Sequence, residues 1–258
     1  EALPQIAQAI DLIAAAVEAG HRLFYQGAGT SGRLGVLDAS ELLPTYSFDP
    51  TRAIGLIAGG RSALTDSVEA AEDDPDLGRS DLQAHDFAAG DILIGIAASG
   101  RTPYVLGGMD YARSLGAPVV AVVCAAGSPM AARATVAIEL LTGPEVITGS
   151  TRMKAGTAQK MALNMLSTAA MVKLGKVYGN LMVDVRPTNA KLRARAARIV
   201  AEAAGLSLDQ AEAALAASGW EVKVAVVMGL LDLPAAEARR LLDQHQGRVR
   251  AAVQAGRG

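Results

Sequence analysis

The sequence has one cysteine, three histidines and no long uninterrupted apolar run. Because Cys124 is the only cysteine, the chain cannot form an internal disulfide, which is typical of a cytoplasmic protein, and we expect that location. No stretch of about 18 uncharged apolar residues occurs, so no membrane-spanning helix is expected. His21, His85 and His245 lack the spacing of metal ligands, and no metal site is predicted.

Neither sign of charge dominates the chain. It has 24 Lys and Arg against 26 Asp and Glu, for a net charge of −2. No broad cationic surface is implied, so nucleic acid is not an expected partner. The 258 residues are 51% hydrophobic, which is enough for one large core or for one domain with a small appendage.

Five short apolar runs alternate with helical patterns along the first 140 residues. Strands are expected at 22–26, 53–57, 92–97, 119–124 and 136–140. Helices are expected at 4–19, 32–43, 61–71 and 103–115. The strand runs are apolar throughout, as in a parallel sheet covered on both faces. The order predicts an α/β fold, a doubly wound, mostly parallel five-stranded sheet flanked by helices.

The rest of the chain is helical in pattern. A long helix with a methionine-rich face is expected over 152–174, packed on the sheet or on a partner subunit, and another over 184–204. Residues 205–258 break into short helices, which predicts a small bundle. We therefore expect two domains, 1–204 and 205–258.

The tripeptide Ser-Gly-Arg occurs twice, at 31–33 and 99–101, each time between an expected strand and an expected helix. Backbone N–H groups and the dipole at a helix N-terminus attract anions, and glycine lets the ligand come close. Both loops follow the carboxyl ends of strands, where such sheets bind ligands. The loops predict a site for a small phosphorylated molecule, and its candidate residues are Gly29, Thr30, Ser31, Ser99, Gly100, Arg101 and Thr102.

The first loop also fits a dinucleotide-binding pattern. Residues 27–32 match G-x-G-x-x-G. A dinucleotide site needs an acidic residue at the end of the next strand, for the ribose hydroxyls. Residues 56–60 (Leu-Ile-Ala-Gly-Gly) contain none. A sugar phosphate is therefore favoured over NAD.

Two acidic clusters and a third glycine-rich segment accompany these loops. Residues 38–41 (Asp-Ala-Ser-Glu) and 69–74 (Glu-Ala-Ala-Glu-Asp-Asp) offer carboxylates for acid–base chemistry, and the residues alone do not select a pair. Residues 149–154 place Arg152 and Lys154 at an expected helix start, where the helix dipole disfavours cations. An anionic ligand or a carboxylate partner would satisfy them, although exposed cations beside an N-cap explain the pattern equally well.

Seven segments, taken together and in order, resemble the N-acetylmuramic acid 6-phosphate etherase family, which is built on a sugar isomerase (SIS) domain. The resemblance covers essentially the whole chain. The segments are 27–35 (Gly-Ala-Gly-Thr-Ser-Gly-Arg-Leu-Gly), 38–41, 55–60, 71–73, 95–104, 149–160 and 179–184.

The resemblance implies cleavage of the lactyl ether by elimination and then hydration, with no cofactor. It implies Glu41 as the acid and Glu72 as the base. It also places Thr30, Ser31, Ser99 and Thr102 on the phosphate or its neighbouring hydroxyls. A homodimer is implied, with the site close to the subunit contact, and a C-terminal bundle like a ubiquitin-associated domain. Lys154 is a candidate for the lactyl carboxylate.

The sequence departs from the usual pattern of the etherase family at two places, and two other functions on the same scaffold remain possible from the sequence alone. The family usually has Cys-Pro-Pro-Thr where residues 42–45 read Leu-Leu-Pro-Thr, and Gly where this chain has Ala70. Neither change removes a catalytic atom. A non-catalytic sugar-phosphate regulator on the same scaffold would not need both Glu41 and Glu72. A ketose–aldose isomerase would not explain residues 149–160.

Overall fold

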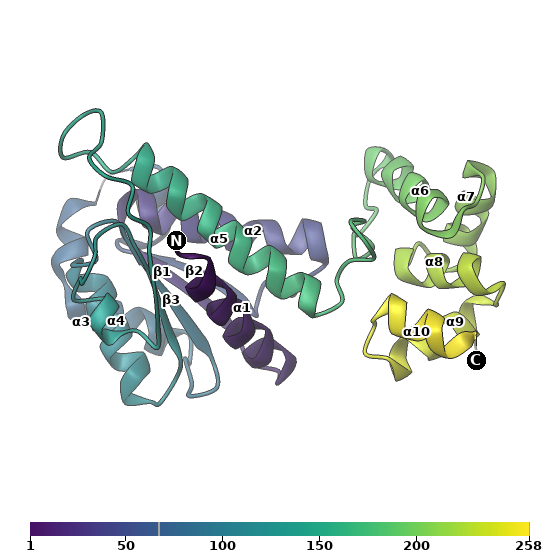
Figure 1. The fold of residues 1–258 in the computed structure, drawn as a ribbon, viewed down its shortest axis with the longest axis horizontal. Helices are drawn as coiled ribbons and strands as arrows, with labels where there is room; N and C mark the ends of the chain where they lie inside the picture. The colour runs from purple at the N-terminus through teal and green to yellow at the C-terminus, as the bar shows by residue number, and fades with distance from the viewer. Residues whose placement is uncertain (67, 258) are drawn as a thin grey trace. The chain divides into compact units, whose positions relative to one another are not determined.

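The computed structural model describes residues 1–66 and 68–257. Contacts divide it into two compact units. The first comprises Glu1–Leu42 and Asp49–Ala170, and the second Leu43–Phe48 and Met171–Gly258. The first unit holds a sheet with its helices, and the second holds a bundle of helices (Figure 1).

The first unit is built on a five-stranded sheet with the order β2-β1-β3-β4-β5, in which every neighbouring pair is parallel. Each strand lies within one residue of its predicted position, so the predicted sheet is confirmed. The strands are β1 Leu23–Gly27, β2 Ala53–Ile57, β3 Ile92–Ala97, β4 Val119–Val123 and β5 Val136–Glu139.

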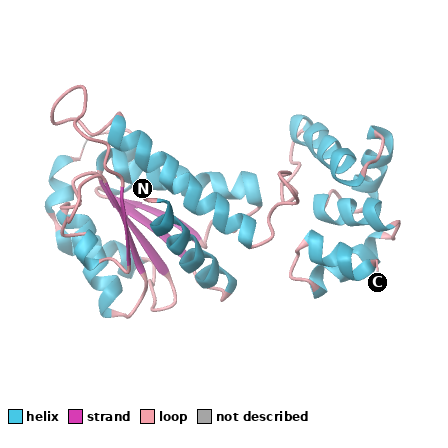
Figure 2. Cartoon of the chain, in the orientation of Figure 1, coloured by secondary structure: helices cyan, strands magenta, loops and turns pink. Residues whose placement is uncertain are grey.

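Helices cover both faces of this sheet (Figure 2). On one face, Phe24 and Leu93 pack with Tyr104 and Met109 of α4 and Leu82 of α3. Since side chains alternate along a strand, the next residues face α2 on the other side. The helices of this unit are α1 Leu3–Glu18, α2 Gly29–Tyr46, α3 Pro75–Ala84, α4 Pro103–Ser114 and α5 Lys154–Lys173, with short 3₁₀ turns η1 Gly60–Leu64, η2 Glu69–Asp73 and η3 Ala131–Arg133.

Helix α2 lies unusually close to the sheet. A Cβ atom on Gly55 would come within 2.6 Å of the Val36 Cα, and one on Gly35 within 2.9 Å of the Tyr25 Cβ. These distances are too short for any side chain. The two glycines therefore set the spacing that holds α2, and with it the first Ser-Gly-Arg loop, against the sheet.

The helix expected over 61–71 is wrong. That segment contains two 3₁₀ turns, and the helix of this region is α3, which begins at Pro75. Asp74 caps α3, because its carboxylate accepts hydrogen bonds from the backbone N–H groups of Asp76 and Leu77 at 2.9 and 3.1 Å. A proline in the first turn is a further signal for the start of a helix. The prediction of a helix over 61–71 followed the apolar periodicity and did not use this signal.

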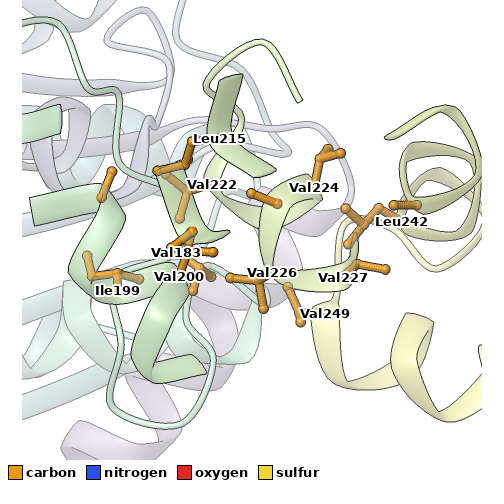
Figure 3. Packing of buried hydrophobic residues seen from close by; sticks show 14 of the residues in the cluster. Val183, Ile199, Val200, Leu215, Val222, Val224, Val226, Val227, Leu242 and Val249 are labelled. Atoms are coloured by element: carbon orange, nitrogen blue, oxygen red, sulfur yellow. The ribbon is translucent and has the colours of Figure 1, made fainter. Parts of the chain in front are cut away.

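The second unit packs five helices around one apolar core. The helix expected from residue 184 begins instead at Ala190, where Asn189 caps it by accepting from the Leu192 N–H. Since α6 contacts α7 and α8, the compact units divide near residue 170 rather than at 204. Figure 3 shows the core, which includes Val200, Leu215 and Val226. The helices are α6 Ala190–Ala204, α7 Leu208–Ala217, α8 Val222–Leu231, α9 Ala235–Gln244 and α10 Val249–Gly256.

Within the described residues, no single helix has the length and apolar content needed to cross a membrane. Helices α7 and α8 pass that test only as a pair bent by 118°. Both contribute buried side chains to the core of the second unit, among them Leu215 and Val226.

A partly buried ion pair between Arg22 and Asp91 joins the start of β1 to the start of β3. The Asp91 carboxylate, 2% exposed, accepts from the Arg22 guanidinium at 2.7 Å and from the Ala88 N–H at 3.0 Å. Burial alone would raise the Asp91 pKa, but these hydrogen bonds outweigh it and the pKa is lowered.

Asp91→Asn should therefore cost about 2 kcal/mol of unfolding free energy at pH 7, measured with urea. Because the folded-state pKa lies below the unfolded value of about 3.9, the stabilisation is complete above that value and is lost as pH falls through the folded pKa. The gap between wild type and variant should narrow progressively as the pH falls below about 4. A gap that does not narrow on acidification would contradict the assignment.

Candidate active site

The two Ser-Gly-Arg loops lie side by side at the carboxyl edge of the sheet. They follow β1 and β3, which are adjacent strands with Gly27 paired to Ile96. Strand β2 lies on the other side of β1, so the chain reverses its direction of travel across the sheet between β1 and β3. Open α/β sheets bind ligands at such a switch point.

The first loop opens α2, and its hydroxyls face different surroundings. Gly29 is exposed, with a φ of +51°, and Thr30 lies against the first turn of α5 beside Gly156. The Ser31 hydroxyl is buried and donates to Gln159 Oε1 of α5 at 2.8 Å. Gly29 and Thr30 thus remain at the sheet edge, whereas the Ser31 hydroxyl joins α2 to α5.

The second loop precedes α4, and its Gly100 packs closely against the Ser128 side chain. Gly100 has a φ of +64°, and a Cβ on it would come within 2.2 Å of the Ser128 Oγ. Ser99 and Arg101 are exposed, and the Ser99 Oγ accepts from the Arg101 N–H at 3.3 Å. Thr102 is the N-cap residue, yet among the described residues its side chain caps no N–H. Its hydroxyl is therefore available to a ligand.

Glu72 shares a hollow with the first loop. A cavity of about 190 Å³ is lined by Gly29 and Arg33 of α2, by Asp66, and by Glu72 of η2, with apolar walls between them. The η2 turn also packs against α4, the helix that begins at the second loop. A carboxylate is thus placed beside the predicted phosphate-binding loops.

Glu41 does not reach this hollow within one chain. It lies on α2, twelve residues beyond Gly29, and an α-helix rises about 1.5 Å per residue, so the two are about 18 Å apart along the axis. Glu41 is exposed, on the same face as Leu37. The structure therefore brings Glu72 to the loops and leaves Glu41 on an outer surface.

A buried network beneath Glu41 was missed by sequence reasoning. The Asp38 carboxylate, 3% exposed, accepts from the Tyr25 hydroxyl and the Asn164 amide, each at 2.6 Å, and from Ser167 at 3.1 Å. Burial raises the pKa of Asp38, and these hydrogen bonds oppose the rise. The network joins the sheet, α2 and α5, and so fixes the part of α2 that presents Glu41. No local pattern reveals it, because Asn164 is 126 residues away in sequence.

A carboxylate of the chain itself binds the N-terminus of α5. The Glu145 carboxylate accepts from the backbone N–H groups of Lys154 and Ala155 at 3.0 and 3.2 Å. The Lys154 N–H is the foremost cause of a lowered Glu145 pKa. The Lys154 ammonium donates to the Pro144 carbonyl at 2.9 Å, so in this structure it faces its own loop rather than the other two. Across residues 1–66 and 68–257, no three His, Cys, Asp or Glu side chains gather as metal ligands.

Arg33, in the first Ser-Gly-Arg tripeptide, was not among the predicted binding residues. Its guanidinium donates to the Leu64 carbonyl at 3.0 Å and to the Asp66 carbonyl at 3.2 Å. Both carbonyls belong to the segment between β2 and η2, and Arg33 itself lines the hollow. The second Ser-Gly-Arg tripeptide differs here, because Arg101 is exposed.

Comparison with known proteins supports one class and one family. A family described as "Glucokinase regulatory protein N-terminal SIS domain" matches residues 5–113, and "SIS domain" matches residues 78–169. N-acetylmuramic acid 6-phosphate etherase 1 of Vibrio cholerae is 58% identical over 253 residues, which is 98% of this chain and 84% of that protein. The etherase of Serratia proteamaculans is 60% identical over 251 residues, 97% of this chain and 84% of that protein.

The parallel sheet and the paired loops at its switch point, together with these matches, define a protein built on a SIS domain. The identity extends through the C-terminal bundle as well as the sheet. The chain belongs to the N-acetylmuramic acid 6-phosphate etherase family.

Proposed function

We propose that this chain is a carbon–oxygen lyase that converts N-acetylmuramic acid 6-phosphate to N-acetylglucosamine 6-phosphate and D-lactate, without a cofactor, in amino sugar recycling. Its proposed compartment is the cytoplasm, where a lone thiol stays reduced. The observation that carries the proposal is the hollow shared by Glu72 and Gly29, in a chain 58% identical to an etherase.

The proposed reaction starts from the open-chain aldehyde of the sugar. Glu72 removes the proton at C2, which the C1 carbonyl makes acidic. The C3–O bond breaks, its electron pair leaves with the lactate oxygen, and Glu41 protonates that oxygen. Water then adds across the C2–C3 double bond, with hydroxyl at C3 and a proton at C2. One carboxyl group must begin as a base and the other as an acid, a division that different surroundings can set.

The phosphate has candidate partners on both loops. Gly29 and Thr30 lie at the start of α2, and Ser99 and Thr102 at the start of α4. Two helix N-termini aimed at one edge of the sheet would stabilise a dianion through their dipoles. The free side chain of Thr102 adds a donor. Arg101 and Lys154 remain candidates for the sugar or its lactyl carboxylate.

We further propose that the working form is a homodimer in which Glu41 acts on the partner's substrate. Leu37, Met161 and Met165 are 43%, 59% and 38% exposed. The bond between Asp38 and Asn164 joins the two helices that carry them, so the three apolar side chains belong to one region. A second copy of the chain would cover this apolar surface and would bring Glu41 to the site of its partner.

A lactate assay on the purified chain tests the activity. With N-acetylmuramic acid 6-phosphate as substrate, we expect one D-lactate released per N-acetylglucosamine 6-phosphate formed. Binding of the substrate without lactate release would favour the sugar-phosphate regulator instead. Lactate release from the unphosphorylated sugar at an equal rate would contradict the assigned role of the two loops.

Arg33→Ala should lower kcat/KM about tenfold to a hundredfold, because the segment leading to Glu72 loses both hydrogen bonds to the guanidinium. Arg33→Lys, which keeps the charge but not the fork of donors, should recover only part of the activity. Arg113→Ala, at an exposed arginine in the last turn of α4, is the matched control and should keep wild-type kcat/KM. Equal kcat/KM in wild type and Arg33→Ala would remove Arg33 from the site.

A further inference from the structure

A cavity in the second unit is lined by none of the residues assigned above. It measures about 780 Å³, within the range of small-molecule sites. Val183, Val222, Val224 and Leu242 form its apolar floor, and Figure 3 shows these side chains spread across the core. Thr188 and Gln246 add hydrogen-bonding groups to the wall.

Cations outnumber carboxylates in the lining. There are five cationic side chains against three carboxylates, and the cations are Lys176, Arg186, Arg193, Lys223 and Arg239. Asp184 is shared between two of them, since it lies 3.0 Å from the Lys176 ammonium and 2.7 Å from the Lys223 ammonium. One carboxylate between two ammonium groups leaves a net positive charge at that wall.

Two arginines keep their charge unopposed. Arg239 pairs with Glu221 at 2.6 Å, whereas Arg186 and Arg193 make no ion pair with any described residue. The Arg193 guanidinium lies instead over the ring of Trp220, 4.8 Å from its centre. A cation held on an aromatic face is oriented without being neutralised.

Trp220 is held in a backbone conformation that a bulky residue rarely adopts. Its φ is +67°, and its N–H donates to the Leu215 carbonyl at 2.7 Å. Such conformations persist only where the surroundings impose them, and they gather at ligand sites. The ring and the arginine above it are therefore preset at the cavity wall.

We propose that this cavity is a second binding site, for a phosphorylated sugar. The excess of two positive charges matches a phosphate monoester dianion, which Arg193 and Arg186 would bind. The apolar floor and the groups of Thr188 and Gln246 would receive a sugar ring and its hydroxyls. The site is independent of the proposed lyase reaction, because all of its residues belong to the second unit.

The test uses the chain's own fluorescence, since Trp220 is its only tryptophan. The full chain is titrated with N-acetylglucosamine 6-phosphate, with inorganic phosphate and with N-acetylglucosamine. We expect a saturable change with the sugar phosphate, a weaker response to inorganic phosphate and none to the neutral sugar. Arg193→Gln should weaken binding at least about tenfold, as loss of a charge-assisted pair predicts. Arg198→Gln, on the same helix but outside the cavity, should match wild type.

A double variant, Ser99→Ala with Thr102→Ala, separates this site from the first one. The proposal predicts that the Trp220 response survives in the double variant, whatever happens to lactate release. Loss of the response there would assign the signal to the sheet edge and overturn the second site. No saturable response at millimolar sugar phosphate in wild type, or equal affinity in Arg193→Gln, would also overturn it.

Discussion

Glu72→Gln is expected to abolish lactate release while leaving the fold intact. Removal of the base for the C2 proton should lower kcat at least about a thousandfold, within the range for a positioned general base. Glutamine keeps the size of the side chain and removes its capacity to accept the proton. Because Glu72 is exposed, Tm should stay within about 2 °C of wild type.

Deuterium exchange at C2 of the substrate shows which step of the reaction each variant has lost. In heavy water, Glu72→Gln should show neither lactate release nor deuterium at C2, since the carbanion never forms. Glu41→Gln should lose lactate release but keep C2 exchange, because the base still acts and only the leaving group lacks its acid. Asp73→Asn, a neighbouring exposed carboxylate, is the matched control and should retain activity. Exchange that persists in Glu72→Gln would transfer the base role to another group.

The sheet could be predicted because its information is local. A strand buried on both faces appears in the sequence as a continuous apolar run, and all five runs became strands. The two loops were predictable for the same reason, since Gly29 and Gly100 both follow such runs and both adopt positive φ. Each of these features is settled by residues close together in the chain.

The features that the sequence did not reveal depend on contacts distant in sequence. Ser31 was predicted among the phosphate-site residues, and the structure adds a hydrogen bond from its hydroxyl to Gln159, 128 residues away. The segment 61–71 has helical spacing, yet its described residues include two short turns, and Arg33 donates to the carbonyls of Leu64 and Asp66 between β2 and η2. Local pattern identifies which residues carry reactive groups, whereas packing decides which of these groups meet.

The separation of Glu41 and Glu72 is the sharpest case. The family resemblance implied one acid–base pair, yet Glu41 lies about three turns along α2 from Gly29, which shares a hollow with Glu72. A substrate whose C2 and C3 are bonded neighbours cannot be served by both groups of one chain. Either Glu41 has no part in the reaction or a second copy supplies it, and these possibilities differ in a measurable way.

Mixing two inactive variants should restore activity. In a dimer with shared sites, Glu72 of one copy works with Glu41 of the other. A mixed dimer of Glu41→Ala and Glu72→Ala then contains one complete site and one that lacks both carboxylates. Random exchange at equal amounts makes half of the dimers mixed, so the mixture should recover about a quarter of wild-type activity. If both carboxylates acted within one chain, no mixture would be active.

The apolar surface provides the control for this experiment. Met161→Glu, introduced into both variants, places a charge on the proposed contact and should prevent recovery, because buried charge without a partner opposes association. Tagged copies purified in series would confirm that mixed dimers are present. Mixed dimers without lactate release would contradict a shared site and return the acid role to a group near Glu72, whereas recovery that survives Met161→Glu would place the contact elsewhere while keeping the site shared. Recovery of about a quarter of wild-type activity in the mixture, and loss of that recovery with Met161→Glu, would together show that α2 and α5 form the subunit contact. They would also show that α2 supplies the acid, Glu41, to the site of the partner subunit.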